Sequence, residues 1–223
     1  MRIETLTTTE ELTAAARSRA YRLLADGFSF PDRVFFASLC SGAYAHEVEG
    51  TLRALPHAFD LPESGLTASV DYLDFQAEYL RLFDVGLGIP PCPLYSGLYR
   101  GGRKAVMEEL TRFYNFFGLS IEQGAGELPD HVTTELEFMH FLAFKELAAL
   151  HQGDDPAPYR RAQVDFLERQ LISWLPALEE RLGSLDAPSF YATLVRATNA
   201  FAHAERAYLQ ESLRPSLAVI EGV

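Results

Sequence analysis

The segment that follows Pro129 constrains the fold more than any other part of this chain, because its apolar residues leave almost no polar face. A helix at a protein surface keeps one polar face, whereas a helix that lacks one must be surrounded by other elements. We therefore predict a central helix from Asp130 to about Leu150. Its apolar residues are Val132, Leu136, Phe138, Met139, Phe141, Leu142, Phe144 and Leu147.

The remaining sequence supplies the neighbours that a central helix needs. Apolar residues recur at helical spacing along most of the chain, and no segment of useful length alternates apolar and polar residues as a strand does. Capping residues mark helix starts, among them Thr8 with Glu11 three residues later, and Asp32. These patterns predict an all-α fold, a single globular domain over residues 1–223 with about eight to twelve helices.

Two of the predicted helices carry more specific expectations. The helix over residues 159–183 contains Pro176, which cannot donate a backbone hydrogen bond, so a kink or a division is expected there. The helix over residues 67–83 should bury one apolar stripe. That stripe consists of Val70, Leu73, Ala77, Leu80 and Phe83.

The clearest irregular segment spans residues 86–102, which include three prolines and five glycines. A flexible tether would be poor in large apolar residues, but this segment is rich in them. They are Ile89, Leu94, Tyr95, Leu98 and Tyr99. The composition therefore predicts a loop that packs onto the protein surface.

Charge and cysteine content narrow the range of partners and locations. The chain has 31 acidic and 19 basic residues, a net charge of −12, whereas nucleic-acid binding needs a basic surface. Cys40 and Cys92 form no metal-ligand or CxxC motif, which favours a reducing compartment. The first residues lack the apolar stretch of a signal peptide, and no apolar run is long enough to span a bilayer. We expect a cytoplasmic protein that binds no nucleic acid and does not insert into membranes.

The start of the central helix carries the most informative polar residues. Asp130 suits the N-cap, where its carboxylate would accept backbone N–H groups. His131 and Glu135 lie one turn apart on one face. The positive end of the helix dipole should keep His131 neutral unless Asp130 or Glu135 compensates. On spacing alone, a helix cap with a satisfied buried histidine is the favoured interpretation.

Other patterns suggest chemistry only weakly. Glu137-x-x-His140 is half of a di-iron motif, but no second Glu-x-x-His pair exists. Gly101-Gly102-Arg103-Lys104 opens a helix and could hold an anion, although no strand precedes it. The alternatives are therefore a metal- or nucleotide-binding helical-bundle enzyme, or a structural protein that uses the apolar loop as an oligomer interface.

The order of motifs along the chain resembles that of the TorD/DmsD/NarJ-like redox-enzyme maturation chaperones, which are all-helical. Single motifs are weak, but the ordered set is specific and covers nearly the whole chain. The motifs are Tyr21-Arg22-Leu23-Leu24, Phe28-x-x-Pro31-Asp32, Glu78-Tyr79-x-x-Leu82-Phe83, Pro90-Pro91-Cys92-Pro93-Leu94-Tyr95, Phe113-Tyr114-x-x-Phe117-Gly118-Leu119, Pro129-Asp130-His131-x-x-x-Glu135 and Trp174-Leu175-Pro176.

The resemblance implies a chaperone and not an enzyme. Such a protein binds the apo catalytic subunit of a molybdenum-containing oxidoreductase of the DMSO reductase type, its twin-arginine signal peptide, or both, until the cofactor is inserted. No cofactor is predicted for this chain, although some members contact guanine nucleotide or the molybdenum cofactor. The resemblance is compatible with a monomer or a homodimer. The loop is most similar to those of chaperones for dimethyl sulfide or ethylbenzene dehydrogenase and selenate or chlorate reductase.

The resemblance also implies a client-binding site, because the family's Pro-Asp-His segment takes part in signal-peptide recognition. Carboxylates at the start of the helix suit two arginines through charge-assisted hydrogen bonds. Aromatic residues suit the apolar stretch that follows the arginines, if the loop folds near the helix start. The predicted client-binding residues are Pro129, Asp130, His131, Glu135, Tyr95, Tyr99 and Phe83.

Two positions depart from the family pattern. Ser96 stands where the family loop often has glutamate, and Gln170 stands where a histidine often precedes the leucine at 171. No role for an acidic group at the first position or for a histidine at the second is carried over to this chain.

Overall fold

The computed structural model describes residues 6–57, 65–84, 88–120, 127–185 and 189–214. Residues 86 and 87 of the predicted irregular loop lie outside these ranges. The described residues contain helices and no strand, which confirms the all-α prediction. The elements are α1 (Thr9–Phe28), α2 (Arg33–Cys40), α3 (Ala43–Arg53), α4 (Tyr72–Phe83), α5 (Gly97–Arg100), α6 (Arg103–Phe116), α7 (Val132–Gln152), α8 (Ala157–Arg169), the short 3-10 helix η2 (Leu171–Ser173), α9 (Leu175–Gly183) and α10 (Ser189–Ser212).

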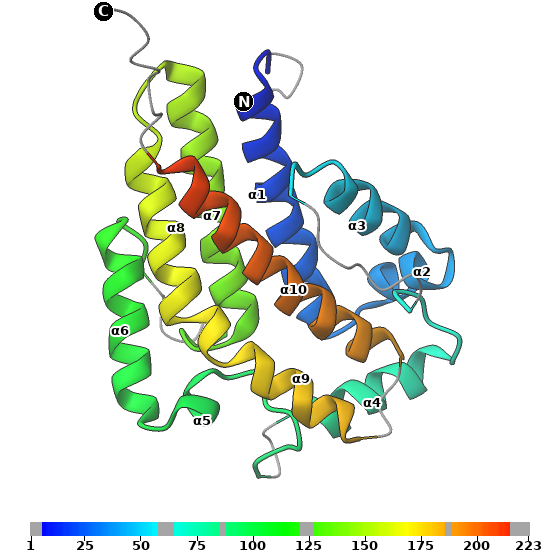
Figure 1. The fold of residues 1–223 in the computed structure, drawn as a ribbon. Helices are drawn as coiled ribbons and strands as arrows, with labels where there is room; N and C mark the ends of the chain where they lie inside the picture. Colours follow the sequence, from blue (N-terminus) through cyan, green and yellow to red (C-terminus); the bar gives the residue numbers. More distant parts are fainter. Residues whose placement is uncertain (1–5, 58–64, 85–87, 121–126, 186–188, 215–223) are drawn as a thin grey trace, which may run out of the picture.

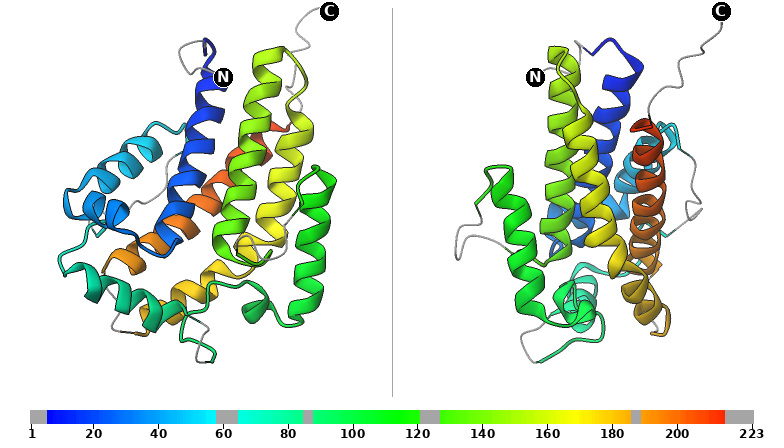
Figure 2. Two further views of the ribbon diagram at one scale, coloured as in Figure 1. Left: turned by 180° about the vertical axis from the view of Figure 1, so that it is seen from behind. Right: turned by 60° about the vertical axis from the view of Figure 1, so that its left-hand side comes forward.

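Helices α1, α7 and α8 form the centre of the fold. They lie side by side, and α10 crosses them (Figure 1). Helices α2 and α3 lie beyond α1, and α6 lies at the opposite edge beyond α8, as the reverse view also shows (Figure 2). The predicted central helix α7 buries Leu136, Met139 and Leu142, whereas Phe144 on its outer edge is 42% exposed.

The first two helices begin at the capping residues that the sequence predicted, Thr8 and Asp32. In α1, the Thr8 hydroxyl accepts from the Glu11 backbone N–H at 3.1 Å, and the Glu11 carboxylate accepts from the Thr8 N–H at 2.8 Å. In α2, the Asp32 carboxylate accepts from the N–H of Phe35 at 2.7 Å. Each cap satisfies donors that the first helical turn leaves unpaired, so the chain needs no tertiary contact to begin these helices.

Helix α4 begins later than predicted, and of the predicted stripe it buries Phe83 alone. Its N-cap is Asp71, and Leu73 and Leu80 of the predicted stripe are 69% and 45% exposed. Phe75 and Tyr79 are buried instead, with the Phe75 ring 5.2 Å from the ring of Tyr191 on α10. Aromatic rings bury more apolar area than leucine side chains, so the aromatic face of α4 turns toward the core.

The predicted helix over residues 159–183 is divided, but not by a kink at its proline. Helix α8 ends at Arg169, and Gln170 leaves the helical conformation with φ −112° and ψ −87°. After η2, Pro176 lies in the first turn of α9. A first-turn backbone N–H has no partner within its helix, so proline begins α9 without the loss of a hydrogen bond.

A buried arginine joins four helices. Arg17 of α1 is fully buried, and its Nε donates to both carboxylate oxygens of Glu205 on α10 at 3.0 and 2.9 Å. Its Nη1 donates to Glu146 of α7 at 2.6 Å, and its Nη2 donates to Gln163 of α8 at 2.5 Å. A buried charge is tolerated only when it is paired and hydrogen-bonded, and Arg17 meets both conditions.

The partners of Arg17 are themselves satisfied. Glu146 also accepts from Arg160 at 2.7 Å and from Gln163 at 2.8 Å, and Glu205 accepts from the Tyr21 hydroxyl at 3.1 Å. Burial acts to raise the pKa of Glu146, but Arg17 and the donors from Arg160 and Gln163 outweigh it and hold the pKa below its usual range. Glu146 therefore stays ionised and keeps its attraction for Arg17.

We predict that Arg17→Met lowers the free energy of unfolding by about 3–5 kcal/mol, because it leaves Glu146 and Glu205 buried without their shared cation. The control is Arg19→Met on the same helix, since Arg19 is 56% exposed and pairs with exposed Glu47. That variant should lose less than about 1 kcal/mol. Urea denaturation measures both, and equal losses would contradict a special role for Arg17.

Candidate functional site

The Pro/Gly-rich loop is joined to the start of α7 by backbone hydrogen bonds. The N–H of Ser96 donates to the carbonyl of Asp130 at 2.8 Å, and the N–H of Val132 donates to the carbonyl of Leu94 at 2.8 Å. The pair encloses an isolated antiparallel bridge between Tyr95 and His131. The structure thus brings the loop to the helix start, as the client-binding hypothesis requires, and fixes Tyr95 against His131.

Pro129 is buried and is held by α6. Its carbonyl accepts from the Tyr114 hydroxyl at 2.9 Å, while the Tyr114 ring packs 4.8 Å from the ring of Phe138 on α7. This contact sets the direction in which the chain enters α7.

Asp130 binds an arginine of the protein itself. Its side chain is fully buried, and Oδ2 accepts from Nε of Arg103 at 3.0 Å. The Arg103 guanidinium also lies 5.0 Å from the centre of the Tyr95 ring, within the range of a cation–π contact. Oδ1 of Asp130 has no hydrogen-bond partner among the described residues. The site therefore holds a guanidinium group between a carboxylate and an aromatic ring.

The close approach of Arg103 to Asp130 requires glycine at position 97. A Cβ there would lie 2.6 Å from Cγ of Arg103 and 2.9 Å from Oδ2 of Asp130. Both distances are shorter than real side-chain contacts, so any larger residue would push the ion pair apart.

His131, and not Asp130, caps α7. Nδ1 of His131 accepts from the backbone N–H of Thr133 at 3.3 Å, which corrects the predicted N-cap. Asp130 instead directs Oδ2 of its carboxylate toward Arg103 on α6. Burial lowers the pKa of His131 although Glu127 and Asp130 oppose it, so the imidazole is neutral and free to accept at Nδ1.

Glu135 lies behind the site and not on its surface. The side chain is fully buried, and Oε2 accepts from the indole N–H of Trp174 at 3.1 Å. Burial raises the pKa of Glu135 to about 8 although the Trp174 donor lowers it. The carboxyl group is therefore mostly protonated at neutral pH, and it does not present the negative charge that the sequence interpretation assigned to it.

The two other predicted aromatic residues lie away from Asp130. Tyr99 is partly buried, with its ring 5.2 Å from the ring of Trp174 and 4.4 Å from the guanidinium of Arg181. Phe83 is only 3% exposed and packs in the core against Tyr79 and Tyr191. Phe83 therefore offers no surface to a client, and the predicted aromatic groove does not extend to it.

The predicted site does not include Glu127, Met107 or Leu128, which the structure places near Tyr95 or Arg103. The Tyr95 hydroxyl donates to the exposed Glu127 carboxylate at 3.2 Å, and burial together with this carboxylate raises the pKa of Tyr95 to about 12.

An open groove of about 720 Å³ adjoins Arg103 along the outer face of α6, and its apolar residues include Met107 and Leu128. The Gly101-Gly102-Arg103 motif marks this place in the sequence, where an ordinary solvated helix start was expected and an anion site was the weaker alternative.

The residues of the weaker motifs, Glu137, His140 and Lys104, make ordinary ion pairs or hydrogen bonds. Glu137 pairs with Arg22 at 3.2 Å, and Nδ1 of His140 lies 2.9 Å from the Ser18 hydroxyl. Within the described ranges, no three histidine, cysteine or acidic side chains gather where they could hold a metal ion. Lys104 is 92% exposed and lies 3.8 Å from Glu108. No helix in the described part of the chain has the length and apolar character needed to cross a membrane.

Comparison with known proteins gives the family. The model of the nitrate reductase delta subunit family matches residues 38–180. The chain belongs to this family. A perchlorate reductase assembly chaperone from Dechloromonas aromatica is 36% identical, and the match covers 89% of this chain and 90% of that protein. A selenate reductase assembly chaperone from Thauera selenatis is also 36% identical, covering 88% and 91%.

The same fold occurs in a crystal structure from Archaeoglobus fulgidus described as a redox enzyme maturation protein. The TM-score is 0.53 at 22% identity, and the match covers 91% of this chain and 98% of that one. The resemblance to redox-enzyme maturation chaperones, inferred from the order of motifs, is confirmed by these relatives.

The raised pKa of Glu135 predicts a pH dependence of stability. A carboxyl group that holds its proton more tightly when folded stabilises the fold at low pH, and this contribution is lost as the pH rises through the folded pKa. The free energy of unfolding of the wild type, relative to Glu135→Gln, should therefore fall between pH 4.5 and about 8. Denaturant unfolding at several pH values measures the difference. A difference that stays constant over this range would mean that Glu135 is already ionised in the folded protein.

Proposed function

We propose that the protein is a cytoplasmic assembly chaperone for a molybdenum-containing oxidoreductase of the DMSO reductase type. It binds the apo catalytic subunit and its twin-arginine leader until the cofactor is inserted, catalyses no reaction and needs no cofactor of its own. Family membership supports this role, as do the relatives named for the assembly of perchlorate and selenate reductases.

The observation that carries the leader-binding part is the position of Arg103. A guanidinium group already lies between the Asp130 carboxylate and the Tyr95 ring. Charge-assisted hydrogen bonds and a cation–π contact are the interactions that recognise arginine in a peptide. Arg103 is 38% exposed, so it can leave, whereas Asp130 is fixed and buried. A leader arginine takes the place of Arg103 on binding.

The surroundings of Arg103 suit the rest of a leader. Exposed Glu127 accepts a hydrogen bond from the Tyr95 hydroxyl and supplies a carboxylate for a second arginine. The open groove along α6, with Met107 and Leu128, begins at Arg103 and suits the apolar stretch that follows the arginines. Two carboxylates and one apolar groove thus match the order of groups in a twin-arginine leader.

We predict that Asp130→Asn weakens binding of a synthetic twin-arginine leader about tenfold, since it replaces a charged acceptor with a neutral amide. Isothermal calorimetry measures the affinity. Glu137→Gln is the matched control, because Glu137 is an exposed acid on α7 that pairs with Arg22. Its affinity should equal that of the wild type.

A second measurement avoids any change to the buried site. A leader with both arginines replaced by lysine should bind the wild-type protein more weakly, because lysine lacks the planar fork that pairs with a carboxylate. In contrast, Arg103→Gln should bind the arginine leader at least as well as the wild type, because the internal competitor is gone. Equal affinity for the two leaders, or a loss of binding in Arg103→Gln, would exclude arginine exchange at Asp130.

A further inference from the structure

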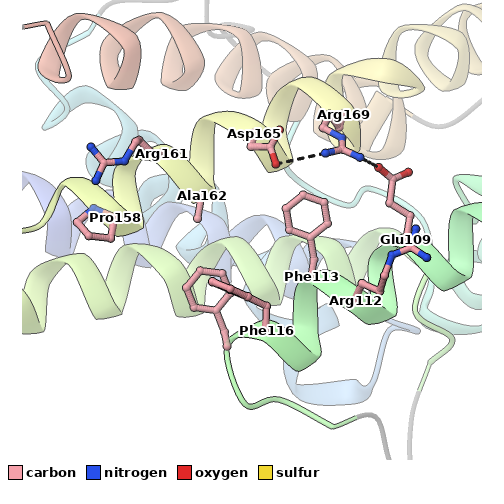
Figure 3. Close-up of a pocket in the computed structure, with 10 residues that line it drawn as sticks. Glu109, Arg112, Phe113, Phe116, Pro158, Arg161, Ala162, Asp165 and Arg169 are labelled. Carbon is pink, nitrogen blue, oxygen red and sulfur yellow. Dashed lines mark hydrogen bonds and ion pairs between the residues drawn. The ribbon is translucent and has the colours of Figure 1, made fainter.

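A second groove, between α6 and α8, has no part in the proposed leader site. It has a volume of about 580 Å³. Figure 3 shows residues of α6 along one wall and residues of α8 along the other. The lining residues are Glu109, Arg112, Phe113, Phe116, Phe117, Pro158, Arg161, Ala162, Asp165 and Arg169.

The base and rim of this groove are aromatic. Phe113 packs edge-on against Phe166 in the core, with ring centres 5.3 Å apart. Phe116 is 83% exposed, and its ring lies 5.1 Å from that of Phe117. An isolated exposed phenylalanine needs no explanation, but one that borders an apolar groove indicates a surface that a partner covers.

Some charged side chains of the groove form ion pairs, and others have no ion-pair partner among the described residues. Arg169 pairs with Glu109 and lies 3.6 Å from Asp165, so one cation engages both carboxylates (Figure 3). Glu109 also pairs with Arg100 at 3.4 Å. Arg112 on α6 and Arg161 on α8 are exposed and have no ion-pair partner among the described residues. In a protein with net charge −12, this groove has an uncompensated cation on each wall.

We propose that the α6–α8 groove binds an amphipathic, acidic helical segment of the client. Its apolar side chains lie on Phe113 and Phe116, and its carboxylates pair with Arg112 and Arg161. The same charges disfavour a twin-arginine leader, because its arginines would meet two unpaired arginines. The inference rests on the proposed function in that it gives the client a second contact, separate from the leader.

Two probe peptides test the charge preference. The first is a synthetic amphipathic helix with leucine and phenylalanine at i, i+3, i+4 and i+7 and glutamate along both flanks. The second has lysine in place of every glutamate. Fluorescence anisotropy with the full-length wild-type chain should give an affinity at least about tenfold higher for the acidic peptide. Equal affinities would overturn the proposal.

Variants locate the binding surface. Phe116→Ser and Arg161→Glu should each weaken binding of the acidic peptide several-fold, while affinity for the twin-arginine leader stays unchanged. Arg112 is not used, because it also borders the groove beside Arg103. The control is Arg53→Glu, which changes an exposed arginine on α3. Unchanged affinity in Phe116→Ser and Arg161→Glu would overturn the proposal.

Two further outcomes separate this proposal from others. If sedimentation shows that Phe116→Ser changes the oligomeric state, a second copy of the chain covers the groove and the client does not. If leader binding is insensitive to Asp130→Asn while the acidic peptide still responds to Arg161→Glu, the leader site is wrong and the groove assignment stands.

Discussion

The arrangement of the helices depends on one buried cation. Arg17 is fully buried and joins α1 to Glu146 on α7, Gln163 on α8 and Glu205 on α10. Apolar packing tolerates small shifts of one helix along another, but a buried ion pair does not, because a lost partner leaves a charge without solvent or counter-ion. The network therefore fixes the register of α7 against α1 and α8, and with it the position of His131 at the other end of the helix.

The candidate site also pairs a buried carboxylate with an arginine, but this arginine is partly exposed. Asp130 is as deeply buried as Glu146, but its cation, Arg103, is 38% exposed and stands at the surface. An arginine with one side in solvent can be exchanged for another at modest cost, whereas Arg17 has no access to solvent. One buried carboxylate is thus paired with a cation inside the core, and the other with a cation at the surface.

Helix α6 lies between two grooves, and Arg112 lines both of them. Next to Arg103, Asp130 and exposed Glu127 supply negative charge beside the groove that contains Met107 and Leu128. Toward α8, Arg169 engages the carboxylates of Glu109 and Asp165, and Arg112 and Arg161 have no ion-pair partner among the described residues. Under the two proposals, a client with a cationic leader and an acidic amphipathic segment would contact both sides of this one helix.

The sequence by itself determined the all-α class, the capped starts of α1 and α2, the central helix and the family, because periodicity, caps and motif order are local properties. It also identified Pro129-Asp130-His131 as a unit. Only the tertiary structure decided that His131 caps α7, that Glu135 and Phe83 are buried, and that Arg103 binds Asp130. Side-chain direction at these positions follows from contacts with distant segments, such as those of Leu94 with Val132 and Tyr114 with Pro129. Local periodicity contains no information about such contacts. For the same reason, Leu73 and Leu80 of the stripe predicted for α4 are exposed, and Phe75 and Tyr79 are buried.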